Sequence, residues 1–137
     1  MTILLVDDEP NYVDALVATL ESNGIRCITA KNMTEGVRVL ETQYADVAAV
    51  VTDIMMPPGP SFSHVNAGEC GFEFIEHVQQ NWPRLPIICL SVIADQARIR
   101  FLARRRVKYL RKGETPLSTA VEVITAVAEG RTGRLRF

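Results

Sequence analysis

Apolar and polar positions follow two different periods along this chain. Short, nearly continuous apolar runs are typical of buried strands, and they cover residues 2–6, 25–30, 47–52, 87–90 and 107–110. Between these runs, apolar residues recur at intervals of three and four, the period of one helical face. Five helices are therefore expected, with apolar positions within 13–20, 33–40, 71–81, 95–104 and 117–128. This alternation predicts an α/β fold in which helices cover both faces of a parallel sheet.

Residues at the segment ends agree with these boundaries. Gly24 follows the first helical segment, and glycine is the usual residue just past a helix end. Asn32 followed by Glu35 resembles a capping arrangement at the start of the second helix. Thr115 and Pro116 suit a cap followed by a proline at the first helical position.

Length and charge indicate one cytoplasmic domain. The 137 residues suffice for one core, and we expect a single domain over 1–130 followed by a short basic tail, 131–137. The net charge of −1 gives no global field, so membrane binding and direct nucleic-acid binding are not expected. No apolar run could span a bilayer, and no signal-like segment follows Met1. Three unevenly spaced cysteines form no disulfide framework, which favours a reducing, cytoplasmic location.

Polar side chains follow four of the five expected strands. Asp7 and Asp8 come after the first, Asp53 after the third, Ser91 ends the fourth, and Lys112 follows the fifth. In a doubly wound sheet of order 2-1-3-4-5, these side chains converge on one edge. Three carboxylates so close would repel one another, and a hard divalent cation with oxygen ligands, Mg²⁺, resolves that repulsion. A carboxylate nucleophile, a metal, a lysine and a hydroxyl suffice to move a phosphoryl group onto an aspartate.

Five motifs in order carry a family resemblance: LLVDDE (4–9), VVTDIMMP (50–57), GFEFI (71–75), ICLS (88–91) and YLRK (109–112). With these motifs the chain resembles the receiver domain of bacterial two-component response regulators, over essentially its whole length. The resemblance implies a flavodoxin-like, doubly wound sheet of five parallel strands, order 2-1-3-4-5, with five helices.

The resemblance also implies a phosphorylation site with a metal. Asp53 would be the phosphoacceptor, and Asp8 and Asp53 would bind Mg²⁺ directly. The backbone carbonyl of Met55 would be a further ligand, while Asp7 would act largely through water.

The remaining family positions imply a switch. Lys112 would pair with the phosphoryl oxygens and Ser91 would donate a hydrogen bond to them. Tyr109 matches the aromatic residue that changes rotamer when the serine moves, which biases the face formed by 95–104, 107–110 and the last helix.

The partners that the resemblance implies are a histidine kinase or phosphotransfer protein upstream and a protein or effector domain downstream. A small phosphodonor would also serve, and a homodimer through the switch face is compatible with the family. Such a domain is not an enzyme for external substrates, because it catalyses only its own phosphorylation and dephosphorylation.

Three features depart from the family pattern. The loop 58–70 is lengthened, and it could cover the acyl phosphate, contact a partner, or be a tolerated insertion. Gly113 stands where the family usually has a proline with a cis peptide bond, and the dihedral freedom of glycine offers an equivalent path. The third feature is an unusually basic segment: Arg98, Arg100, Arg104, Arg105, Arg106, Lys108 and Arg111. It could attract an acidic partner, a second copy or nucleic acid, or be a solvated face.

Two other function classes compete with this interpretation. A phosphatase of the haloacid dehalogenase kind also starts from an aspartate at a strand end, but it needs a second acid two residues later, where Met55 stands. The second alternative is a pseudo-receiver, a protein-interaction module that works without phosphorylation. The complete set of acids, serine and lysine argues against it, while the long loop and Gly113 keep it open.

Overall fold

The computed structural model describes residues 1–131, so most of the basic tail lies outside the described residues. The strands are β1 (Thr2–Val6), β2 (Arg26–Ala30), β3 (Val47–Thr52), β4 (Ile87–Ser91) and β5 (Lys108–Arg111). The helices are α1 (Pro10–Ser22), α2 (Met33–Gln43), α3 (Cys70–Asn81), α4 (Gln96–Arg104) and α5 (Leu117–Arg131). Short 3-10 turns are η1 (Tyr44–Asp46), η2 (Pro60–Phe62) and η3 (Ala67–Glu69).

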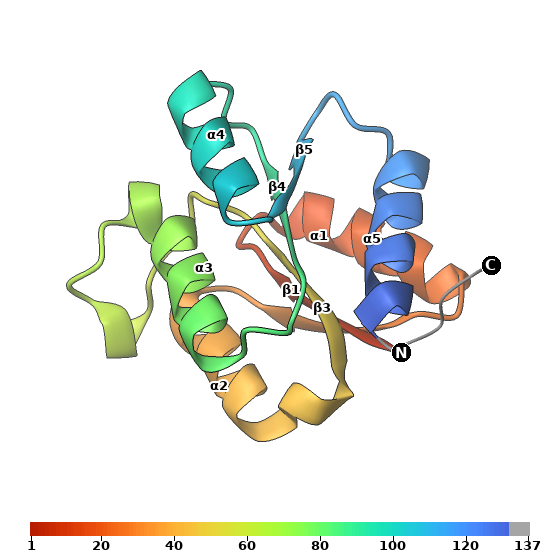
Figure 1. Cartoon of the computed structure of the whole chain (residues 1–137). Helices are drawn as coiled ribbons and strands as arrows, with labels where there is room; N and C mark the ends of the chain where they lie inside the picture. The colour runs from red at the N-terminus through yellow and green to blue at the C-terminus, as the bar shows by residue number, and fades with distance from the viewer. Residues whose placement is uncertain (132–137) are drawn as a thin grey trace.

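The five strands form one parallel sheet in the order β2-β1-β3-β4-β5, which confirms the predicted topology. Helices α1 and α5 cover one face, and α2, α3 and α4 cover the other (Figure 1). Because the order reverses between β1 and β3, the loops that follow these strands diverge and leave an open edge. No helix among the described residues is long and apolar enough to cross a membrane.

Strand pleating divides the buried side chains into two cores. In β1, Leu4 and Val6 point into the core beneath α2, α3 and α4, whereas Ile3 and Leu5 point into the core beneath α1 and α5. All five residues of β1 are buried, as a central strand of a covered sheet requires. Packing on both faces of the sheet therefore holds the end of β1, and the residues that follow it, in place.

Residues 58–70 are held against α2 and α3. The hydroxyl of Thr34 donates to the carbonyl of Pro58 (2.8 Å) and accepts from the N–H of Ser61 (3.1 Å). Gly59 has a φ of 78°, and a Cβ there would lie 2.5 Å from the Thr34 hydroxyl oxygen, so this turn requires glycine. Phe62 packs edge-on against His77. The lengthened loop is thus an ordered segment, and it contains two short 3-10 turns, η2 and η3.

Candidate functional site

The carboxyl edge of the sheet brings together the predicted polar side chains that follow β1, β3 and β5. The ammonium nitrogen of Lys112 lies 2.8 Å from Oδ2 of Asp7 and 3.0 Å from Oδ2 of Asp53. It also lies 2.9 Å from Oε1 of Glu9, a contact that the sequence analysis missed. The only sequence signal for Glu9 was its place in the acidic run after the first strand.

One ammonium group is therefore shared by three carboxylates, two of them buried. The side-chain exposures are 6% for Lys112, 2% for Asp7 and 11% for Asp53, while Glu9 is exposed. Burial by itself lowers the pKa of Lys112, but its hydrogen bonds to the three carboxylates outweigh burial and raise that pKa above its ordinary value. Lys112 is consequently a fixed positive charge at neutral pH.

The pKa of Asp7 is raised as well, so the same surroundings favour the charged form of Lys112 but disfavour the charged form of Asp7. Burial is the largest influence on this carboxyl, and it raises the pKa even though Lys112 and the N–H of Glu9 act to lower it. The nearby charge of Asp53 raises the pKa of Asp7 further. An additional positive charge at this edge would stabilise the ionised carboxylates.

The backbone around Asp53 fixes the orientation of its side chain. Oδ1 accepts from the N–H of Ile54 (2.6 Å), which leaves Oδ2 directed at Lys112. At the start of α3, the N–H of Gly71 donates to the carbonyl of Ile54 (2.8 Å). A Cβ at Gly71 would lie 2.3 Å from the carbonyl oxygen of Asp53, so only glycine permits this approach. Gly71 is thus a positioning residue, whereas sequence analysis used it only as part of a motif.

Ser91 is fully buried at the end of β4, and its hydroxyl has no hydrogen-bond partner among the described residues. A buried hydroxyl left without a partner costs about 1–3 kcal/mol. Such a group in a folded protein calls for an explanation, for example a ligand that completes it. The backbone carbonyl of Ser91 accepts from the N–H of Lys112 (2.9 Å), which ties the serine to the lysine.

Tyr109 is half-buried on β5 and reaches the segment that follows Ser91. Its hydroxyl donates to the backbone carbonyl of Ile93, and it lies 3.4 Å from the carbonyl oxygen of Ser91. Burial raises the pKa of the Tyr109 hydroxyl, so it remains a donor at neutral pH. The tyrosine is therefore bonded to the chain between β4 and α4.

Gly113 allows the chain to turn directly after Lys112. Its φ is 87°, a value that residues with a side chain rarely adopt, and a Cβ there would meet no neighbouring atom. No cis peptide bond occurs in the part of the chain that the structure describes. Lys112 reaches the carboxylates with this backbone path.

The carboxylates at this edge could supply only some of the oxygen ligands that Mg²⁺ needs. Asp8 is exposed and makes no hydrogen bond or ion pair with residues 1–131, and the side chain of Met55 is also exposed. Within the same range, no three side chains of Asp, Glu, His or Cys are placed to hold a metal by themselves. Magnesium commonly uses one or two carboxylates together with water and phosphate oxygens. The carboxylates at this edge fit that arrangement and not a closed cage.

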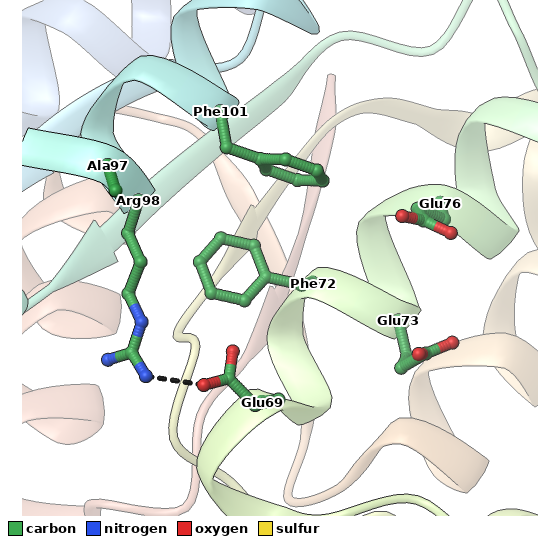
Figure 2. A pocket seen from close by; sticks show the side chains of 7 residues that line it. All are labelled: Glu69, Phe72, Glu73, Glu76, Ala97, Arg98 and Phe101. Atoms are coloured by element: carbon green, nitrogen blue, oxygen red, sulfur yellow. Dashed lines mark hydrogen bonds and ion pairs between the residues drawn. The ribbon is translucent and has the colours of Figure 1, made fainter.

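A cavity near the long loop lies apart from this edge. It measures about 440 Å³ and is lined by α3 and α4, where Phe72 and Phe101 meet edge to face (Figure 2). At its rim, Arg98 of α4 forms an ion pair with Glu69, the last residue of η3. None of the residues that bind Lys112 lines this cavity. The lengthened loop therefore contacts α2, α3 and α4, and none of its side chains, all of which the structure describes, forms a hydrogen bond or ion pair with Asp7, Asp53 or Lys112.

Together, the doubly wound sheet and the acidic edge define a flavodoxin-like domain whose site lies where the strand order reverses. The sequence model of the response regulator receiver domain matches residues 3–123. The chain belongs to the response regulator receiver domain family. Receiver domains of this family are signalling domains of two-component systems and not classical enzymes, and they generally bind Mg²⁺ at the phosphorylation site.

Two relatives and one solved structure illustrate what the chain is similar to. It is 32% identical over 94 residues (69% of the chain) to the hydrogenase transcriptional regulatory protein HoxA of Cupriavidus necator. It is 30% identical over 89 residues (65% of the chain) to the transcriptional regulatory protein GlrR of Escherichia coli. The matches span only 17% of each of these proteins. A receiver domain protein from Clostridium thermocellum has the same fold, with a TM-score of 0.80, 21% identity and 98% of both chains covered.

Proposed function

We propose that this domain accepts a phosphoryl group on Asp53 and signals by changing the face formed by α4, β5 and α5. The donor would be a histidine kinase, a phosphotransfer protein or a small phosphodonor. The observation that carries the proposal is the buried pair of Asp53 and Lys112, 3.0 Å apart, together with the partnerless hydroxyl of Ser91, a residue whose backbone carbonyl accepts from the N–H of Lys112. A carboxylate, a fixed cation and a free donor are three of the groups that phosphoryl transfer to an aspartate uses, and a divalent cation is the fourth.

In the proposed reaction, a carboxylate oxygen of Asp53 attacks phosphorus. The new P–O bond forms as the bond from phosphorus to the donor's nitrogen or oxygen breaks. A histidine leaving group takes up a proton, whereas the carboxylate of an acyl phosphate leaves as the anion. Lys112 then offsets the charge of the phosphoryl oxygens, because its ammonium already lies beside Asp53. The N–H of Ile54 holds the attacking carboxylate in place.

The proposed reaction also uses a divalent cation, Mg²⁺. Asp8 and Asp53 would hold Mg²⁺ directly, with the carbonyl of Met55 as a further ligand and Asp7 acting through water. Bound there, Mg²⁺ would neutralise charge on the phosphoryl oxygens. Support comes from the unpaired, exposed carboxylate of Asp8 next to the buried Asp7.

The switch would start at Ser91. Its hydroxyl would donate to a phosphoryl oxygen and gain the partner that it lacks. Any shift of Ser91 would move the chain that leads to Ile93, whose carbonyl accepts from Tyr109. Phosphorylation would thus bias β5 and α4 together, and the altered face would bind a downstream protein or effector domain, or a second copy.

The domain would catalyse only its own phosphorylation and dephosphorylation. A phosphatase of the haloacid dehalogenase kind needs an acid where Met55 stands, and Met55 is an exposed, uncharged side chain. A cytoplasmic location accords with three cysteines that remain free thiols.

The pseudo-receiver remains the second candidate, and one observation favours it. The ammonium of Lys112 already pairs with the carboxylates of Asp7 and Asp53. A pseudo-receiver would keep the same conformation in the presence of Mg²⁺ and beryllofluoride. A receiver would show NMR shift changes at Ser91 and Tyr109, and Ser91→Ala would reduce those at Tyr109.

The chemistry is tested by incubation with Mg²⁺ and acetyl phosphate, followed by intact mass. We expect one labile phosphoryl adduct on the wild type and none on Asp53→Asn. Asp14→Asn, which removes an exposed acid on α1, is the matched control and should be modified like the wild type. If neither small donors nor a cognate kinase modify the wild type, the pseudo-receiver interpretation replaces this proposal.

A further inference from the structure

Basic residues are concentrated in one segment that spans α4 and β5. Residues 98–111 contain seven of the fifteen basic residues and no acidic residue. The rest of the chain therefore holds eight basic and all sixteen acidic residues. A net charge near zero conceals a positive segment on a negative body.

Three of the seven cations are already paired within the chain. Arg98 binds Glu69, Arg105 binds Glu76 (3.2 Å) and Arg111 binds Glu114 (2.7 Å). The other four are exposed and form no ion pair with the described residues: Arg100, Arg104, Arg106 and Lys108. We call these four residues the basic turn, since they lie on α4, on the connection that follows it and at the start of β5 (Figure 1).

Arg106 occupies a backbone position that favours glycine. The N–H of Arg106 donates to the carbonyl of Ala103 and that of Val107 to the carbonyl of Leu102, both at 3.0 Å. These two bonds define a Schellman motif, in which the residue after the helix cap is left-handed and is usually glycine. Arg106 has a φ of 61°, the only positive φ of a non-glycine residue in the described range.

The end of α1 shows the same motif with the usual residue. There the N–H of Gly24 donates to Glu21 and that of Ile25 donates to Leu20, at 3.0 and 3.1 Å. Gly24 has a φ of 79°. The chain thus uses glycine at one left-handed helix end and an exposed arginine at the other. An outlier of this kind is a reason to look for a function.

The connection that bears Arg106 is firmly held. The side-chain amide of Gln79 donates to the carbonyl of Arg105 (2.8 Å), and the guanidinium of Arg105 lies 4.7 Å from the ring centre of Phe101. Leu102 and Val107 are buried on either side. Charges on a rigid support bind a partner with little loss of backbone entropy.

We propose that the basic turn is a docking surface for an acidic segment of a partner protein. The four cations lie close along the chain and match a short acidic peptide, whereas domains that bind nucleic acid are usually basic overall. The negative remainder of this chain would repel a long phosphate backbone. The surface lies at the amino end of β5, and Lys112 follows its carboxyl end, so this inference goes beyond the proposed phosphorylation.

The test measures fluorescence anisotropy of a labelled poly-glutamate peptide at low salt, without phosphodonor. Because each exposed charge pair contributes modestly, Arg104→Ala and Arg106→Gly should each weaken binding about two- to fivefold. Arg106→Lys should keep the wild-type affinity. Arg38→Ala removes an exposed arginine from α2, so it makes the same change in net charge and should leave binding unchanged.

A stability measurement separates docking from folding. Arg106→Gly should keep or raise the thermal midpoint of unfolding, because glycine suits the left-handed position, and should still weaken binding. An equal loss of affinity in Arg38→Ala would overturn the proposal in favour of net charge alone. Tighter binding of a single-stranded DNA of equal charge, with the same response to the variants, would assign the surface to nucleic acid. Salt-sensitive self-association that Arg106→Gly removes would assign it to a second copy.

Discussion

The acidic edge and the basic turn are both rich in charge, and they differ in where that charge lies. At the edge, Lys112 and Asp7 are almost fully buried and bonded to each other. At the turn, Arg104, Arg106 and Lys108 are exposed and unpaired with any described residue. Solvent screens the second group but hardly reaches the first.

This difference in burial determines how strongly a substitution should affect the stability of the folded protein in each region. At the edge, burial raises the pKa of Asp7 and leaves the hydroxyl of Ser91 without a partner, so removing one group alters several others. At the turn, the only cost that the structure shows is the left-handed backbone of Arg106. We therefore expect large, coupled effects of substitution at the edge and small, independent effects at the turn.

The largest expected effect is that of Lys112→Met. It leaves the buried carboxylates of Asp7 and Asp53 without their cation, and breaking a buried ion pair costs about 3–5 kcal/mol. Urea unfolding at neutral pH measures the loss. Lys108→Met, which removes an exposed and unpaired lysine, should change stability by less than about 0.5 kcal/mol. Equal effects of the two substitutions would remove the distinction between the regions.

Gly71→Ala should have the next largest effect. The added methyl would lie 2.3 Å from the backbone of Asp53 and Ile54, and such overpacking costs about 1–3 kcal/mol. Gly130→Ala is the matched control on α5, where a Cβ meets no atom and alanine favours a helix by up to about 1 kcal/mol. Unfolding curves of both variants provide the comparison, and a neutral Gly71→Ala would mean that α3 does not hold the Asp53 backbone.

Gly24→Arg tests the helix-end comparison directly. It places an arginine in the left-handed position at the end of α1, where no neighbour would clash, so only the backbone contributes. The expected loss is about 1 kcal/mol. If unfolding by urea shows no loss, the arginine at position 106 carries no backbone cost and the argument from Arg106 weakens.

The smallest effect expected is a gain in stability from Asp7→Asn. The pKa of Asp7 in the folded protein lies above its ordinary value of 3.8, so its contribution to stability is fully present below pH 3.8 and is lost as pH rises through the folded-state pKa. At neutral pH the amide should therefore be more stable than the acid.

The stability difference between Asp7→Asn and the wild type should depend on pH. The advantage of Asp7→Asn should shrink as pH falls toward 3.8, because the acid of the wild type then becomes neutral as well. Unfolding by denaturant at a series of pH values measures it. An advantage that does not change with pH, or a less stable variant at neutral pH, would contradict the role of burial at Asp7.

Much of the fold could be predicted because its signals are local. Continuous apolar runs and helical periods gave the elements, and the ends of parallel strands necessarily share an edge. The capping of α2 is confirmed as well, since the side chain of Asn32 accepts from the N–H of Glu35 (2.9 Å). The convergence of Asp7, Asp53 and Lys112 followed from strand order alone.

Contacts between distant segments could not be predicted. Glu9 binds Lys112 across 103 residues of sequence, and Thr34 anchors the loop at Pro58 through a hydroxyl that no pattern singles out. The left-handed backbone of Arg106 could not be predicted, because glycine and not arginine is the residue that marks such a position in a sequence. The functional roles of all the site residues stay predictions, those of Asp7, Asp53 and Lys112 included, because they concern a phosphorylated, metal-bound state.

The most direct test of the central claim is to locate the phosphoryl group. After reaction with acetyl phosphate and Mg²⁺, borohydride converts an aspartyl phosphate into homoserine, which tandem mass spectrometry places in the sequence. We predict homoserine at position 53 and at no other aspartate, with no conversion when Mg²⁺ is removed by chelation. Conversion at Asp7 or Asp8, or a phosphoryl group that resists borohydride, would contradict the account.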